Sequence, residues 1–266
     1  MRRRRWTAFD RAYGWCMTGT RILVVQPSEI DPPQRLGEWL AGAGAQLHVV
    51  PGASSDLPQD IEGYDGLVVL GGEMGALDDA EHPWLARVRG LLSGAVSARV
   101  PVLSVCLGAQ LLAVATAGQV RRASSGPDVG TVLVAKRDAA ADDPLLGSVA
   151  LTPDVLQFRQ DEIRALPPSA VLLAASPSGE NQAFRVGECA YGLQFHVETT
   201  TETVLDWARR MPELASAARP HQLEGAHLDA FHEDLAETWR PVAEEFVRLA
   251  ATPPDERNRR RELPLA

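Results

Sequence analysis

The chain has 266 residues, of which 35 are acidic and 26 are Lys or Arg, and its formal net charge is −9. A surface of this sign repels phosphate groups, which argues against binding to nucleic acid. The apolar runs fall short of the roughly 20 residues that a transmembrane helix needs, so we expect no membrane span.

Charged residues open and close the chain. We expect residues 1–19 to be a poorly ordered extension, and the arginine-rich stretch after residue 256 to be a solvated tail. No apolar stretch follows the basic start, which argues against a secretory signal, and Met17 is an alternative start. Three cysteines form an odd, sparse set that predicts no disulfide framework and favours a reducing cytoplasm.

The first half of the chain alternates apolar runs with helical stretches, starting with RILVVQ at 21–26. This alternation implies βαβ crossovers and a mainly parallel sheet. The further predicted strands are 46–50, 65–70 and 101–105, and the predicted helices are 34–43, 81–98 and 107–117.

After Gly118 the pattern changes to short strands separated by turn residues, which suggests hairpins added to one edge of the sheet. We predict these strands at 131–136, 155–158, 171–174, 182–186 and 190–195, then a helix at 199–210. Residues 211–225 look like a linker. Residues 229–250 form an amphipathic pattern, in which Pro241 starts or kinks the second half of the helix.

The expected fold class is therefore α/β, an open, mainly parallel sheet flanked by helices, with an added antiparallel edge and a C-terminal helical extension. We expect a catalytic domain over residues 20–210. The linker and extension cover 211–266, and the extension can cover the domain, pair with a second copy in a homodimer, or dock another protein.

A single cysteine stands where an apolar strand runs directly into an apolar helix. At such a turn the Cys106 side chain reaches the carboxyl edge of the sheet, and the helix N-terminus favours its thiolate. The N–H of Leu107 points where an oxyanion forms, and Gly108 leaves room at the first helical turn. On this segment alone, a buried structural cysteine is an equally good interpretation.

A second segment supports the catalytic interpretation. The predicted strand 190–195 ends in His196, with Glu198 two residues further on. A thiol nucleophile needs a general base, and the base needs a carboxylate to orient it. The alternative is a strand-end histidine and a helix-capping glutamate. Because the cysteine and the His-x-Glu pair both follow strands, we predict a Cys106–His196–Glu198 triad.

The two segments together resemble the class I, triad-type, glutamine amidotransferases, whose patterns are Gly-x-Cys-x-Gly-x-Gln and Gln-Phe-His-Pro-Glu. Here residues 104–110 read SVCLGAQ and residues 194–198 read QFHVE. The resemblance covers roughly 21–210, is closest to stand-alone, GMP-synthase-like members, and implies a flavodoxin-like sheet.

The resemblance also implies the other site residues. The glycine-rich segment after the third strand, with Gly71 and Gly72, is similar to the oxyanion loop of the family. It implies that the N–H groups of Gly72 and Leu107 bind the oxyanion, and that Gln110 and Asp161 lie near the substrate. Without the resemblance, a simple glycine-rich turn is the default interpretation.

Three positions depart from the family pattern. Ser104 replaces a glycine before the nucleophile, so its Cβ must be accommodated at a tight turn. Val197 replaces the proline between the histidine and the glutamate. Arg159 stands where relatives often carry a histidine, which affects the shape and charge of the outer substrate contacts.

The implied reaction is attack of Cys106 on the δ-carbonyl of glutamine or another γ-glutamyl amide, through a γ-glutamyl thioester. It requires no metal or cofactor, and His221, His227 and His232 are too loosely spaced to predict a zinc site.

No nucleotide-binding motif of a synthetase is recognisable in the sequence, which leaves three hypotheses. The enzyme hydrolyses glutamine for a separate synthetase, or it is a stand-alone γ-glutamyl hydrolase or peptidase, which Arg159 slightly favours. The third hypothesis, a non-catalytic module on the same fold, does not explain why all three triad residues are present.

Overall fold

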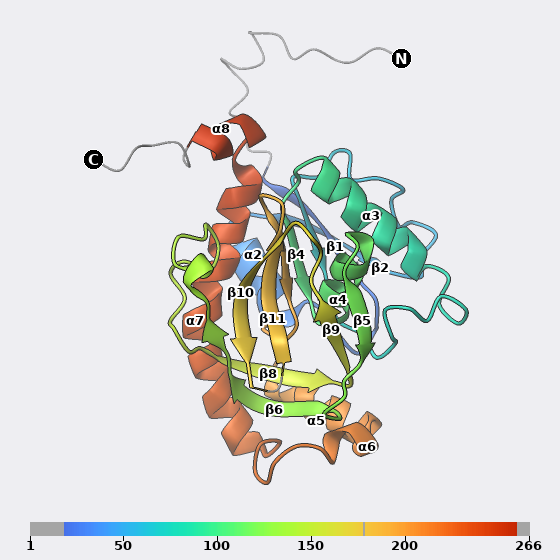
Figure 1. Ribbon diagram of the computed structural model, residues 1–266, viewed down its shortest axis with the longest axis vertical. Helices are drawn as coiled ribbons and strands as arrows, with labels where there is room; N and C mark the ends of the chain where they lie inside the picture. The colour runs from blue at the N-terminus through green and yellow to red at the C-terminus, as the bar shows by residue number, and fades with distance from the viewer. Residues whose placement is uncertain (1–18, 178, 260–266) are drawn as a thin grey trace.

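The computed structural model describes residues 19–177 and 179–259 (Figure 1). The predicted N-terminal extension, apart from residue 19, and the arginines after residue 259 lie outside the described residues. Among the described helices, none is both long enough and apolar enough to cross a membrane.

An eight-stranded sheet forms the centre of the molecule, in the order β2-β1-β3-β4-β12-β11-β10-β7. The first five strands of this order pair in parallel, and the remaining pairings are antiparallel. The predicted parallel sheet with an antiparallel edge is therefore confirmed. The strands are β1 (Arg21–Gln26), β2 (Gln46–Pro51), β3 (Gly66–Val69), β4 (Val102–Val105), β7 (Ala135–Lys136), β10 (Ala170–Ser176), β11 (Gly179–Val186) and β12 (Ala190–Leu193).

Helices cover both faces of the parallel half (Figure 1). Alternate residues of β1 point to opposite faces, as the two-residue period of a strand requires. Ile22 and Val24 belong to the cluster that includes α2 and α7, whereas Leu23 and Val25 belong to the cluster with α3 and α4. The helices are α2 (Gln34–Gly42), α3 (Leu85–Ser97), α4 (Leu107–Ala115), α5 (Thr201–Arg210), α6 (Pro212–Ala215), α7 (Gly225–Ala251) and α8 (Pro254–Arg259), with a 3-10 turn at Asp138–Ala140.

The prediction that all strands after Gly118 join one edge is wrong. Strand β6 (Asp128–Leu133) pairs with β8 (Asp154–Arg159) in a separate two-stranded sheet. Strand β5 (Gln119–Arg122) pairs with β9 (Asp161–Ala165) in another, and neither of these strands was predicted. Both are mostly polar, so they carry little of the hydrophobic pattern that marks a strand.

Three helix predictions also need correction. Helix α3 begins at Leu85 rather than at residue 81, because residues 81–84 form turns. The expected linker contains the short helix α6. Helix α7 starts at Gly225, four residues before the prediction, and continues as one helix through Pro241.

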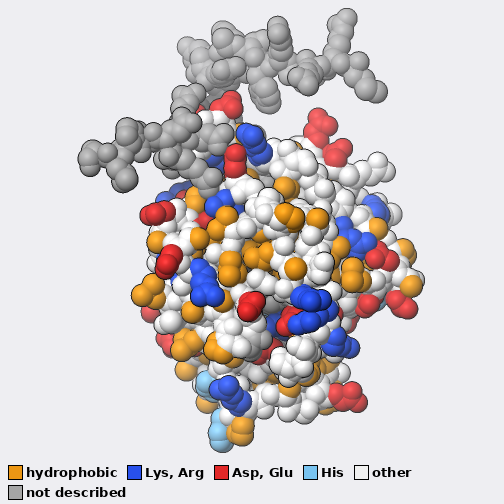
Figure 2. Space-filling model, viewed as in Figure 1, with side chains coloured by type: hydrophobic (Ala, Val, Ile, Leu, Met, Phe, Trp, Pro, Cys, Tyr) orange, Lys and Arg blue, Asp and Glu red, His pale blue; other side chains and the backbone are white. Residues whose placement is uncertain are grey.

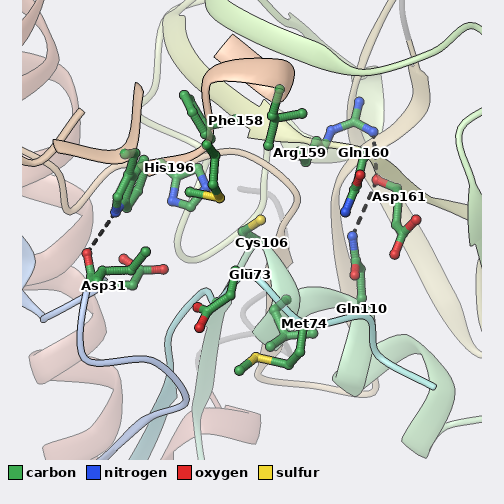
Figure 3. A pocket seen from close by; sticks show the side chains of 16 residues that line it. Asp31, Glu73, Met74, Cys106, Gln110, Phe158, Arg159, Gln160, Asp161 and His196 are labelled. Atoms are coloured by element: carbon green, nitrogen blue, oxygen red, sulfur yellow. Dashed lines mark hydrogen bonds between the residues drawn. The ribbon is translucent and has the colours of Figure 1, made fainter. Parts of the chain in front are cut away.

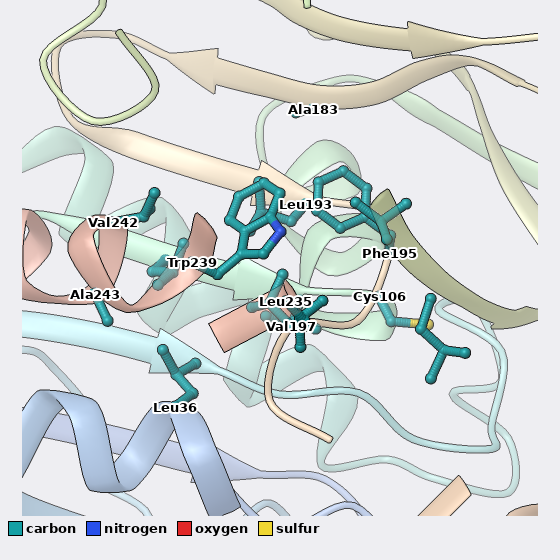
Figure 4. Close-up of a cluster of buried hydrophobic side chains, with 14 of the residues drawn as sticks. Leu36, Cys106, Ala183, Leu193, Phe195, Val197, Leu235, Trp239, Val242 and Ala243 are labelled. Atoms are coloured by element: carbon teal, nitrogen blue, oxygen red, sulfur yellow. The ribbon is translucent and has the colours of Figure 1, made fainter. Parts of the chain in front are cut away.

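Helix α7 packs its apolar side against the sheet. Trp239 packs against Phe195, which follows β12, with 5.1 Å between ring centroids and an angle of 57° between the ring planes (Figure 4). Its other buried apolar residues include Leu228, Phe231, Leu235, Val242, Phe246 and Val247. The C-terminal helix therefore covers the domain with the face that the amphipathic pattern marks. On the face seen in Figure 2, acidic and basic side chains are interspersed around an apolar area.

Candidate active site

The turn between β4 and α4 holds Cys106 in an unusual backbone conformation, with φ 49° and ψ −108°. Such strain is typical of a nucleophile turn at the edge of a sheet. The turn is pressed against the end of β3, because a Cβ on Gly108 would lie 2.2 Å from the Val69 carbonyl oxygen. The Gly108 N–H also donates to the Leu70 carbonyl, at 3.1 Å. Glycine is therefore required sterically at this position.

Ser104, which replaces the family glycine, is completely buried in β4. Its Oγ has no hydrogen-bond partner among the described residues. The strand accommodates the extra Cβ, but at the cost of an unpaired buried hydroxyl.

The loop after β12 carries His196 and Glu198, both buried. The His196 Nδ1 and Glu198 Oε1 atoms are 2.5 Å apart, and Glu198 Oε2 accepts a hydrogen bond from the Val197 N–H at 2.8 Å. The backbone N–H of His196 donates to the Leu156 carbonyl at 2.9 Å, which fixes the loop. The other ring nitrogen, Nε2, makes no hydrogen bond within the described part of the chain. The imidazole and the Cys106 sulfur face the same pocket (Figure 3).

The charges of this pair are set by competing effects. Burial lowers the pKa of His196, but Glu198 and Cys106 together hold that pKa well above its ordinary value. Burial raises the pKa of Glu198, whereas His196 and the backbone N–H groups lower it, and the net shift is downward. The arrangement therefore favours an imidazolium beside a carboxylate, which is the state that stabilises a neighbouring thiolate.

Gly71 and Gly72, after β3, lie next to His196 and next to the start of α4, respectively. A Cβ on Gly71 would lie 2.1 Å from Asp31 Oδ2 and 3.1 Å from the His196 Cε1 atom. A Cβ on Gly72 would lie 3.1 Å from a methyl carbon of Leu107, the first residue of α4. The N–H of Leu107 has no preceding helical turn to bond to. Gly72 therefore lies against the first residue of α4, next to the start of that helix.

One side of the pocket is polar and contains Gln110 and Asp161 (Figure 3). The Gln110 Nε2 donates to the Asp161 carbonyl at 3.3 Å, and Arg159 Nη1 donates to the same oxygen at 2.9 Å. The buried Arg159 guanidinium also pairs with Asp128 at 2.9 Å. Arg159 therefore fixes the Asp161 backbone with its own charge compensated. Burial raises the pKa of Asp161, against an opposing effect of Arg122.

The opposite side of the pocket is apolar, and sequence reasoning did not identify it. Its residues come from the loop after β1, from β8 and from the α5–α6 region, namely Ile30, Phe158, Trp207, Met211 and Leu214. The Trp207 ring lies 4.8 Å from the His196 ring and 5.4 Å from the Phe158 ring, centroid to centroid. No sequence motif marks these residues, because Trp207 and Met211 read only as part of a helix and a linker.

Asp31 is a further residue that sequence reasoning missed. One carboxylate oxygen of Asp31, one of Glu198 and a ring nitrogen of His196 all lie within 4.8 Å of one another. Among the described residues, this is the group dense enough to suggest a metal site. However, His196 Nδ1 is already hydrogen-bonded to Glu198 Oε1, so these two atoms are not free ligands for a metal ion. The sequence offered one signal for Asp31, namely its position after β1, at the carboxyl edge of the sheet.

Known proteins resemble this chain in sequence. Gamma-glutamyl peptidase 4 of Arabidopsis thaliana is 27% identical over 150 residues, covering 56% of this chain and 59% of that protein. The glutamine-hydrolysing GMP synthase of Christiangramia forsetii is 30% identical over 149 residues, covering 55% of this chain and 27% of that protein. The chain thus spans less than two thirds of either relative.

A solved structure and a family model cover more of the chain. The crystal structure of a glutamine amidotransferase from Methylobacillus flagellatus superposes with a TM-score of 0.77 at 28% identity, over 87% of this chain and 96% of that chain. The model of the class-I glutamine amidotransferases matches residues 34–204. The chain therefore belongs to the class-I glutamine amidotransferase family.

Proposed function

We propose that the chain hydrolyses the side-chain amide of glutamine through a γ-glutamyl thioester on Cys106 and supplies the ammonia to a separate synthetase. The observation that carries this proposal is the joint placement of a strained Cys106 turn and a buried His196–Glu198 pair at one pocket. A nucleophile, a base and an orienting carboxylate are the parts that amide hydrolysis needs.

The proposed reaction has two halves. The Cys106 thiolate attacks the amide carbon, and the N–H groups of Gly72 and Leu107 stabilise the oxyanion. The imidazolium of His196 then gives its proton to the leaving nitrogen. Ammonia departs and the thioester forms. His196 then takes a proton from water, and the resulting hydroxide attacks the thioester to release glutamate and the thiolate.

The raised pKa of His196 supports this sequence of proton transfers. Cys106 and Glu198 both favour the charged ring, so the resting site holds a proton ready for the leaving group. The Glu198 carboxylate compensates the imidazolium charge in the buried site. Activity should depend on Glu198 staying ionised, and should therefore fall as the pH falls through its lowered pKa.

A second candidate is a stand-alone γ-glutamyl hydrolase or peptidase, which the apolar side of the pocket favours. The leaving nitrogen must approach His196, and the ring of His196 lies against Trp207. Ammonia gains nothing from an apolar wall, whereas an amine with an apolar substituent buries surface there. The Arabidopsis relative is named a gamma-glutamyl peptidase. Arg159 supports this second candidate less than its place in the sequence suggested, since Asp128 compensates its charge.

A substrate panel tests both candidates. We expect ammonia release from glutamine, and amine release from γ-glutamyl amides of increasing apolar size if the second candidate applies. Cys106→Ala should lower either rate by about a thousandfold or more. Release that persists in Cys106→Ala would rule out both candidates. A rise of kcat/KM with the apolar size of the amine favours the peptidase, and stimulation of glutaminase activity by an added synthetase favours the first candidate.

Labelling identifies the nucleophile directly. Diazo-oxo-norleucine, a glutamine-analogue electrophile, should modify Cys106. Cys189 is the matched control because it is also a free, buried cysteine, and burial raises its pKa. Labelling of Cys189 instead would show that the wrong cysteine had been chosen.

A further inference from the structure

Asp31 lies in the loop between β1 and α2, where the chain is anchored on both sides of it. The Asp31 N–H donates to the Ser28 carbonyl at 3.2 Å. The Trp207 Nε1–H donates to the carbonyl of Ile30, the preceding residue, at 2.7 Å. Two prolines follow at 32–33 and restrict the backbone on the other side. The loop therefore fixes the Asp31 carboxyl group in one place, with 2% of the residue exposed.

The neighbours of this carboxyl group are His196 and Glu198, the base and the carboxylate of the candidate triad. Glycine at position 71 makes the close approach possible, because any Cβ there would lie 2.1 Å from Asp31 Oδ2. Glu198 is completely buried, and both of its oxygens already accept hydrogen bonds, from His196 and from the Val197 N–H. One oxygen of Asp31 lies within 4.8 Å of one oxygen of Glu198, and two buried carboxylates at this separation repel each other, which favours protonation of one of them.

The surroundings decide which of the two carries the proton. Glu198 has the imidazole and backbone N–H groups to stabilise its charge, whereas Asp31 Oδ1 has no hydrogen-bond partner among the described residues. The charged groups that face Asp31 are Glu198 and His196 after β12, and Glu73 after β3. Burial and the charge of Glu198 raise the pKa of Asp31 well above its ordinary range, with His196 acting in the opposite direction.

We propose that Asp31 is a positioning residue, a neutral carboxylic acid whose proton is shared with Glu198 and holds that carboxylate in place behind His196. This inference rests on the proposed function, because it assigns Asp31 to the same triad. A neutral acid leaves the site with one carboxylate to balance one imidazolium. It also stabilises the anionic form of Glu198, since a hydrogen bond to the charged form lowers the pKa of a carboxyl group.

An infrared measurement tests the protonation state without relying on activity. At pH 7 the full-length protein should show the C=O stretching band of a protonated carboxyl group, shifted in D2O. Asp31→Asn should remove this band, and Asp56→Asn, at an exposed loop position, should retain it. If Asp31→Asn leaves the wild-type spectrum in this region unchanged, Asp31 is ionised and the inference is wrong.

Kinetics test the positioning role. Asp31→Ala should lower kcat about tenfold, as expected for a lost hydrogen bond to a charged group, with a smaller effect on KM. Because Glu198 loses its donor, its pKa rises, and the acid limb of the kcat–pH profile should move to higher pH. Asp31→Asn retains an N–H donor and should recover most of the lost kcat, with its acid limb back near that of the wild type.

A purely structural effect of Asp31→Ala would lower kcat by the same factor at every pH. The inference is therefore wrong if the acid limb of the Asp31→Ala profile coincides with that of the wild type. Asp31→Asn also keeps the test valid if Asp31→Ala does not fold. The outcomes are separable from failure of the proposed function. If the proposed function is wrong, the rates of ammonia or amine release persist in Cys106→Ala. The infrared band, in contrast, depends only on the Asp31 proton.

Discussion

The two ends of the candidate triad are built in different ways. The backbone holds Cys106, because the turn is fixed by its own strand and helix and by Gly108 against the Val69 carbonyl. His196 and Glu198 are held instead by contacts with segments far away in the sequence, namely the Leu156 carbonyl, the Arg35 N–H and the Trp207 ring. The nucleophile end should therefore be sensitive to added volume, and the base end to changes in charge and hydrogen bonding.

The C-terminal helix takes part in the base end through His232. This buried residue of α7 contacts Thr199, next to Glu198, with 3.0 Å between Nε2 and Oγ1. Its Nδ1 lies 2.8 Å from the Leu228 carbonyl oxygen, which requires the Nδ1–H tautomer and makes Nε2 the acceptor. Arg35 connects the same parts, because its N–H donates to the Glu198 carbonyl and its Nη1 to the His232 carbonyl.

The largest effect is expected from Glu198→Gln, at the base end. The amide cannot compensate an imidazolium and can present an N–H to His196, which favours the wrong tautomer, so kcat should fall by about a hundredfold to ten-thousandfold. Glu188→Gln, on a half-buried side chain with a long contact to Arg99, is the control and should retain activity. Steady-state kinetics with a thermal melt separates chemistry from stability, and a Glu198→Gln kcat within threefold of wild type would remove Glu198 from the triad.

A smaller effect is expected from Gly108→Ala, at the nucleophile end. The new Cβ would overlap the Val69 carbonyl, so the turn must move, costing about 1–3 kcal/mol in the free energy of unfolding. A displaced Cys106 should also lower kcat by about a hundredfold. The matched control is Gly90→Ala in α3, where nothing lies within 4 Å of the new Cβ. The control should be neutral or stabilising by up to about 1 kcal/mol. Equal stability of the two variants would contradict the steric argument.

The contrast between the two ends also explains what the sequence could predict. The strand, the nucleophile and the helix around Cys106 are contiguous, so a local pattern identifies them. His196 and Glu198 are two residues apart on one loop and are equally visible. Asp31 and Trp207 carry no motif, and their proximity to the site depends on how the loop after β1 and helix α5 pack.

Prediction of the fold from the sequence was limited in the same way. Strands β1, β3 and β4 are buried on both faces, so continuous apolar runs predicted them and their parallel pairing. The partner of β8 was not predictable in this way, because β6 and β8 pair away from the main sheet. Period-two patterns identify a strand but do not identify which edge it joins. The polar strands β5 and β9 lack even that pattern.

The smallest effect concerns the connection between α7 and the base end. Burial, and secondly Arg35, lower the pKa of His232 to about 4 from an ordinary 6.5, so the folded protein favours the neutral ring. Below pH 6.5 the unfolded chain binds a proton at this residue that the folded chain does not. The stability that depends on the neutral ring is therefore complete above pH 6.5, and is lost as the pH falls towards 4.

His232→Gln should remove this part of the pH dependence. At pH 7 the variant should lose about 1–2 kcal/mol, because its hydrogen bonds to Thr199 and Leu228 are weakened. Between pH 6.5 and 4 its melting temperature should fall less steeply than that of the wild type. His227→Gln, at an exposed position of the same helix, should retain the wild-type slope. If all three proteins show the same slope, His232 is not held neutral, and the C-terminal helix supports the base end by packing alone.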